Sequence, residues 1–192
     1  MKRILCGALF VVAAGTVMAG EIHGKVACEG QTDSANAVVY VAKIAGKTFP
    51  PPKEHVSLDQ INRLFTPLVL PVLVGTTVDF VNSDPYAHNV FSPDACADKF
   101  NLGTFTKGEK KSHLFKKECF ATLLCIVHPE MEGFIAALPT PYFAVTKADG
   151  SYDIRDVPDG SYTVKVWHPK LKGTEKPVTV AGSTQADFKI AR

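Results

Sequence analysis

The chain has 192 residues, of which 46% are hydrophobic and 21% are charged, and its formal net charge at pH 7 is +2. A chain so close to neutral lacks the dense basic surface that nucleic-acid binding requires, so nucleic acid is not an expected partner. The length allows one ordinary domain, or one medium and one small domain.

Residues 1–19 have the pattern of a secretory signal peptide. Lys2 and Arg3 precede an uncharged apolar run that ends at Met18, followed by the small residue Ala19. The run is shorter than the roughly 20 residues of a spanning helix, and no later segment is long and uncharged enough, so we expect no stable membrane span. Cys6 precedes most of the run, a poor position for lipid attachment. The alternative to cleavage is retention as an uncleaved anchor.

Cleavage after residue 19 would remove two of the 21 basic residues and none of the 19 acidic ones, which leaves 19 of each. The mature protein is therefore expected to be soluble, neutral overall, and periplasmic or extracellular.

Short apolar runs rich in β-branched and aromatic residues recur along the rest of the chain, separated by Gly, Pro, Asn and Asp. This spacing predicts an all-β fold, and thirteen prolines argue against long helices. One short helix is expected over residues 58–64. The clearest strand candidates are 24–28, 37–42, 76–81, 120–127, 133–138, 152–157 and 161–167.

The segment after Pro141 reads as a small β-sandwich. Asp149-Gly150 and Pro158-Asp159-Gly160 are turn signals, and an alternating strand with Tyr162-Thr163-Val164 follows them. This pattern resembles the carboxypeptidase regulatory-like domains, which implies a module over residues 141–192.

Such modules normally begin with a Gly-x-Val strand and an Ala-Val-rich strand, and a pair of this kind occurs at Gly24 to Val26 and Ala37 to Val39. One hypothesis is a split module, in which residues 20–48 and 141–192 form one sandwich around an inserted domain of residues 49–140. The alternative is that the first strands belong to the inserted domain.

Three potential metal ligands stand three residues apart. These residues, Cys125, His128 and Met131, lie at the end of an apolar strand and across a turn that Pro129 forces. A thiolate, an imidazole and a thioether suit copper, and a mononuclear electron-transfer site needs a second imidazole. His88 is the best candidate, because it follows a strong strand in a loop that begins at Asn82.

The early His88-Asn89 pair, followed by a C-x-x-H-x-x-M loop, resembles the cupredoxins over residues 56–138, and the short ligand loop is most similar to that of amicyanin. Looser similarities point to bacterial plastocyanin-like proteins of the methylamine-utilisation type. The resemblance implies a Greek-key sandwich holding one type 1 copper ion. His88, Cys125 and His128 would be equatorial ligands and Met131 the axial one, with Asn89 hydrogen-bonding across to the ligand loop.

Taken singly, each residue could be present for a reason other than metal binding. Cys125 could be a buried thiol of the core, and each histidine could be an ordinary surface residue. Their joint spacing and order favour copper. The four other histidines outside this pattern are expected to lie on the surface: His23, His55, His113 and His168.

The mature chain has four cysteines, an even number in an oxidising compartment. Copper ligation by Cys125 would remove it from pairing. Cys96 and Cys119 flank a hairpin-like segment that a disulfide would close, which leaves Cys28 either buried or free for an intermolecular bond. A disulfide at Cys125 would instead exclude the copper site.

The expected function is an exported carrier of single electrons between redox partners. The resemblance implies that His128 reaches the surface as the electron exit, within an apolar rim of Pro85, Tyr86, Pro129 and Met131 that docks a transient protein partner. A copper-delivery protein without electron transfer is the alternative, and a matrix-binding or sugar-binding module is a third. An enzyme is not expected, because no base is paired with a nucleophile.

Overall fold

The computed structural model describes residues 19–192, and in this part the chain is all-β, as the sequence predicts. Ala19 is the first residue of the first strand, whereas the rest of the expected signal peptide, with Cys6, lies outside the described residues. Within the described part, no helix has the length and apolar character needed to cross a membrane.

The strands and one 3-10 turn of residues 19–192 follow in chain order. They are β1 (Ala19–Cys28), β2 (Val38–Val41), β3 (Val56–Ile61), β4 (Leu64–Thr66), β5 (Val69–Leu73), β6 (Thr77–Asn82), β7 (His88–Phe91), η1 (Ala95–Ala97), β8 (Asn101–Phe105), β9 (Lys110–Leu114), β10 (Cys119–Leu124), β11 (Glu132–Leu138), β12 (Phe143–Val145), β13 (Ser151–Pro158), β14 (Gly160–His168), β15 (Leu171–Val180), β16 (Ser183–Gln185) and β17 (Phe188–Ile190).

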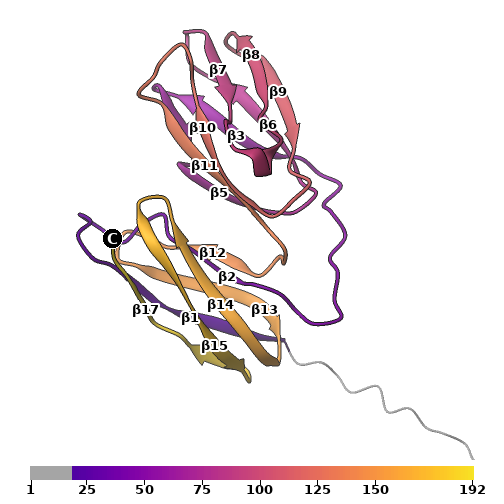
Figure 1. The fold of residues 1–192 in the computed structure, drawn as a ribbon, viewed down its shortest axis with the longest axis vertical. Helices are drawn as coiled ribbons and strands as arrows, with labels where there is room; N and C mark the ends of the chain where they lie inside the picture. Colours follow the sequence, from indigo (N-terminus) through magenta and orange to yellow (C-terminus); the bar gives the residue numbers. More distant parts are fainter. Residues whose placement is uncertain (1–18) are drawn as a thin grey trace, which may run out of the picture.

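The strands form two stacked groups (Figure 1). In the central sandwich, strands β3 to β11, a sheet of order β5-β11-β10-β7-β8 faces a sheet of order β4-β3-β6-β9. In the terminal sandwich, β13-β1-β16, with β17 also on β1, faces β12-β2-β14-β15. Strands β1 and β2 therefore pair with strands from the last third of the chain, β1 with β13 and β2 with β12 and β14.

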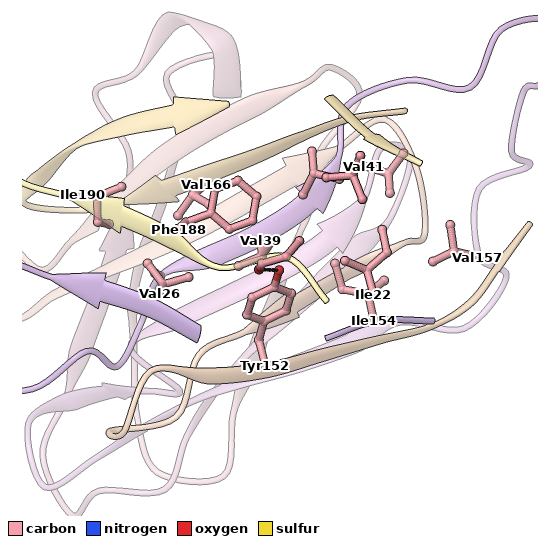
Figure 2. Close-up of a cluster of buried hydrophobic side chains, with 14 of the residues drawn as sticks. Ile22, Val26, Val39, Val41, Tyr152, Ile154, Val157, Val166, Phe188 and Ile190 are labelled. Carbon is pink, nitrogen blue, oxygen red and sulfur yellow. Dashed lines mark hydrogen bonds between the residues drawn. The ribbon is translucent and has the colours of Figure 1, made fainter. Parts of the chain in front are cut away.

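The core of the terminal sandwich is built from alternating apolar side chains of its two sheets. Ile22 of β1, Val39 of β2 and Tyr152 of β13 belong to this cluster, in which Ile22 lies beside Ile154 and Val39 lies near the Tyr152 ring (Figure 2). The Tyr152 hydroxyl is buried and donates a hydrogen bond to the carbonyl of Ala186, so the phenol places no unpaired polar group in the core.

The central sandwich has a separate core, in which Leu58 and Phe80 of one sheet meet Leu123 and Ile135 of the other. All four side chains are fully buried. The expected disulfide between Cys96 and Cys119 is present and ties η1 to the start of β10. Cys28 is a buried free thiol in the terminal core.

The two sandwiches meet along the outer face of β11. Phe134, Ala136 and Leu138 are buried there against Val38 and Tyr40 of β2. The ring of Trp167, from β14, stacks on Phe120 of β10 with centroids 4.7 Å apart and planes 10° from parallel. The contact between the sandwiches is thus an apolar layer with an aromatic stack.

The helix expected over residues 58–64 is wrong, because this segment is a β-hairpin. Leu58 and Gln60 point inward at the two-residue period of a strand, and Ile61 pairs with Leu64. Asn62 and Arg63 between them have φ values of 56° and 57°. Positive φ at both central residues is the conformation of a tight two-residue hairpin turn, and helical geometry does not include it.

The strand expected over residues 120–127 ends earlier, at Leu124. The side chains of Ile126 and Val127, which the sequence placed in the strand, are 61% and 44% exposed. The chain leaves the sheet at Cys125, and this early departure creates the ligand loop described next.

Candidate metal centre

His88 lies at the start of β7 with its side chain fully buried. Its Nε2 atom lies 2.8 Å from Oδ2 of Asp84. An ionised carboxylate only accepts hydrogen bonds, so Nε2 carries the proton and Nδ1 presents a lone pair. A ligating histidine in a metal site is held in the same way.

Asp84 is itself held by the β3–β4 hairpin. Its two carboxylate oxygens accept the backbone N–H groups of Asn62 at 2.7 Å and Arg63 at 2.8 Å. Burial alone would raise the pKa of Asp84, but hydrogen bonds from Arg63, His88 and Asn62 together outweigh burial and lower it. The buried carboxylate is therefore ionised at neutral pH and fixes the orientation of the His88 ring.

Sequence reasoning missed Asp84, although Asp84 and His88 stand four residues apart in one short loop. The spacing alone did not reveal the contact, because it depends on the tight turn at Asn62 and Arg63 that draws the carboxylate inward.

Cys125 follows β10 directly, is 3% exposed and is not in a disulfide. The backbone N–H of Asn89 points at its Sγ atom from 3.4 Å. This contact helps to fix the position of the sulfur, the atom through which cysteine binds metal. The thiol is thus available as a ligand, and the alternative of a disulfide at this position is excluded.

His128 and Met131 complete the loop. The N–H of Met131 donates to the carbonyl of His128 at 3.0 Å, which closes a turn around Pro129. The Nδ1 atoms of His128 and His88 face each other at 3.0 Å. Met131 is fully buried and belongs to the core of the central sandwich.

One group of three or more potential His, Cys, Asp or Glu ligands occurs within residues 19–192, namely His88, Cys125 and His128, whose ligand atoms all lie within 4.8 Å of one another. Two imidazoles and one thiolate, with a methionine in the same loop, form the donor set of mononuclear copper sites of the electron-transfer type. The residues present therefore fit copper. If copper is bound, the two facing Nδ1 atoms and Sγ would hold it.

Asn89 joins the two segments that carry the ligands. Its Oδ1 accepts a hydrogen bond from the backbone N–H of Ile126, the residue after Cys125, at 3.4 Å. The Asn89 side chain is 2% exposed, so this bond crosses from β7 to the ligand loop inside the protein.

Exposed apolar side chains lie around His128, next to the charged groups of Arg63, whose guanidinium lies over the Tyr86 ring, and of the exposed Glu130. Tyr86 is 50% exposed and its ring lies edge-on to the His128 ring, with centroids 6.3 Å apart. Ile126 and Val127 are exposed on the ligand loop itself. The prediction that Met131 is part of the exposed apolar rim is wrong. Its side chain is fully buried, because the thioether turns into the core of the central sandwich.

The other histidines do not join the ligand group. Among the four, the surface placement is wrong for His168, which is 7% exposed. It lies on the inward face of β14 together with Val164 and Val166, at the two-residue period of the strand. Burial lowers the pKa of His168, and its Nδ1 accepts a hydrogen bond from the backbone N–H of Lys170 at 3.1 Å. The ring is therefore a hydrogen-bonded part of the core.

No protein-family model and no curated protein matches the chain. Among solved structures, a purple cupredoxin from Nitrosopumilus maritimus is 26% identical over 43% of this chain and 98% of its own, with a TM-score of 0.40. A reduced amicyanin variant is 21% identical over 55% of this chain and 99% of its own, with a TM-score of 0.42. A copper-containing nitrite reductase from Thermus scotoductus is 26% identical over 52% of this chain and 25% of its own, with a TM-score of 0.43.

Proposed function

We propose that this protein is an exported carrier of single electrons, with one type 1 copper ion held by His88, Cys125, His128 and Met131. The observation that carries the proposal is the convergence of three ligand atoms, from segments 37 residues apart in the chain, to within 4.8 Å of one another. His88, Cys125 and His128 would be the equatorial ligands, and the buried Met131 would supply an axial thioether.

Contacts within the protein hold two of the proposed ligands. The His88 ring is fixed by Asp84, and Cys125 receives the N–H of Asn89. Copper would supply a centre that alternates between Cu(I) and Cu(II). A site whose ligands are fixed in one arrangement keeps structural change between the two states small, and small rearrangement favours fast electron transfer.

Burial of the ligands supports electron transfer over copper delivery. His88 is fully buried and Cys125 is 3% exposed, so an incoming acceptor protein could not reach either to take the metal by ligand exchange. Four protein ligands would also leave no open position for a substrate, which supports a carrier rather than an enzyme.

The partly exposed His128 is the proposed point of electron exit. Tyr86, Ile126 and Val127 form an exposed apolar patch around it. Such a patch suits brief docking of a protein redox partner, because apolar contact without fixed ion pairs allows rapid release.

The disulfide between Cys96 and Cys119 supports export, to the periplasm or beyond the cell. Disulfides of this structural kind form and persist in oxidising compartments and are rare in the cytosol. Export by the proposed signal peptide of residues 1–19 can be checked from the first residue of the mature protein.

For the architecture we propose a copper domain, residues 49–140, inserted into a split module of residues 20–48 and 141–192 that resembles the carboxypeptidase regulatory-like domains. The pairing of β1 and β2 with β12, β13 and β14 supports it, as do the separate cores of the two sandwiches. Hydrogen exchange of the intact protein tests it. The amides of β1 and β2 should share their protection with β12 to β17, and protection shared with β3 to β11 instead would contradict the split.

The proposed function is tested by loading the mature protein with Cu(II) and then adding a one-electron reductant. We expect one copper ion per chain, an intense visible band from the Cu(II)–thiolate bond, loss of the band on reduction and its full return on reoxidation. Colourless copper binding would instead favour the delivery role.

A further inference from the structure

A β-bulge lies in the β7–β8 hairpin, beside the candidate metal centre. Asn89 pairs with Thr104 and Phe91 pairs with Asn101, so one residue of β7 is opposite two residues of β8. Gly103, one of the two, has a φ of 72°, which is the conformation of the bulge type that requires glycine. Bulges of this kind change the direction of nearby side chains.

The bulge gives Asn101 two hydrogen-bond partners. Its Oδ1 accepts the backbone N–H of Gly103 at 2.9 Å and the Nδ2–H of Asn89 at 2.8 Å. The first bond holds the Asn101 carboxamide against the bulge, and the second reaches the side chain that bridges to the ligand loop.

The Asn101 contact settles which way the Asn89 amide faces. With Nδ2 donating to Asn101, the Oδ1 of Asn89 is left to accept the N–H of Ile126. The reverse orientation would place two carbonyl oxygens against each other at Asn101 and two donors against each other at Ile126, so it is excluded.

We propose that Asn101 is a positioning residue of the metal centre, which orients Asn89 and through it holds the ligand loop at Ile126, next to Cys125. The hydrogen bonds that link Gly103, Asn101, Asn89 and Ile126 involve protein atoms alone, whereas the effect of Asn101 on copper rests on the proposed function. Asn101 itself is exposed, so its substitution leaves the core of the central sandwich intact.

The first test uses the copper-free protein and measures hydrogen exchange at the Ile126 amide by NMR. Asn101→Leu keeps the approximate shape of the side chain and removes the acceptor, whereas Asn101→Asp retains it. We expect exchange about tenfold faster in Asn101→Leu, the effect of weakening one hydrogen bond, and close to the wild-type rate in Asn101→Asp.

Thr104→Ala is the matched control, because Thr104 is an exposed residue of the same strand that pairs with Asn89 through the backbone. Its Ile126 exchange should equal that of the wild type. An unchanged rate in Asn101→Leu, or an equal acceleration in Thr104→Ala, would overturn the proposal.

The second test uses the copper-loaded protein. The visible spectrum and the reduction potential should change in Asn101→Leu and stay at the wild-type values in Thr104→Ala, because only the first alters the position of the Cys125 loop. Equal spectra and potentials in all variants would contradict the link to the metal. A wild-type protein that binds no copper would contradict the proposed function. The hydrogen-exchange rates at Ile126 would still test whether Asn101 holds the loop in place.

Discussion

Oδ2 of Asp84 accepts the Nε2–H of His88 at 2.8 Å, with both groups buried. The carboxylate is in turn held by the N–H groups of Asn62 and Arg63. One hairpin turn, one carboxylate and one imidazole therefore form a chain of contacts that ends at the lone pair of His88 Nδ1.

Replacing Asp84 by Asn should weaken copper binding by about 10- to 100-fold, the usual effect of removing the partner that orients a ligating histidine. A chelator competition titration measures it. Ser83→Ala is the control, because Ser83 lies in the same loop and bonds to Asp59 instead. Equal affinities in Asp84→Asn and the wild type would show that the His88 ring needs no anchor.

Acid should destabilise the protein through Asp79. Hydrogen bonds from Lys110, Ser112 and His55 lower the pKa of this buried carboxyl far below its usual range. The folded state then binds the proton less readily than the unfolded state, so the stabilisation is complete above about pH 4 and is lost as the pH falls further.

Asp79→Asn tests this by urea unfolding at pH 7 and pH 3. We expect a loss of about 2 kcal/mol at pH 7, because the charged hydrogen bonds are weakened, and a smaller difference from the wild type at pH 3. Asp153→Asn, which removes an exposed ion pair with Arg155, should change little at either pH. A difference for Asp79→Asn that grows in acid would contradict the sign.

Removing the disulfide should lower the stability of the central sandwich. The bond joins residues 23 apart in sequence, and a crosslink over a loop of this size stabilises by about 3 kcal/mol. The double variant Cys96→Ser/Cys119→Ser should show this loss in denaturant unfolding while it still binds copper. Loss of copper binding in a folded double variant would mean that the bond also shapes the metal centre.

We expect Trp167 to make the two sandwiches unfold together in one cooperative transition. Its stack on Phe120 joins β14 to β10, and Trp167→Ala should cost about 2 kcal/mol because the ring is only partly buried. Circular dichroism should then resolve two unfolding transitions where the wild type shows one, and Trp167→Phe should restore the single transition. A single, unshifted transition in Trp167→Ala would show that the stack does not hold the sandwiches together.

Features that depend on residues close together in the sequence could be predicted. Cys125, His128 and Met131 are visible as a candidate because a short loop keeps their spacing, and the strands alternate with a clear two-residue period. The segment between Cys96 and Cys119 indicated the disulfide that the structure contains, although the sequence did not decide the pairing.

Features that depend on the direction of side chains across the fold were missed. The side chains of Asp84 and Asn101 accept hydrogen bonds from turn residues with positive φ values, namely Asn62, Arg63 and Gly103. Asn62 and Arg63 explain the failed helix over residues 58–64, since Leu58 and Ile61 stand at a helical spacing of three residues but the chain reverses just after them. Burial of His168 was overlooked although its alternation with Val164 and Val166 was readable.

X-ray absorption at the copper edge of the loaded protein tests the proposed site most directly. We predict two imidazole nitrogens and one short copper–sulfur contact in the wild type, and the loss of that short contact alone in Cys125→Ser. Copper held by nitrogen and oxygen only in the wild type, or a short sulfur contact that survives in Cys125→Ser, would contradict a metal centre built on His88, Cys125 and His128.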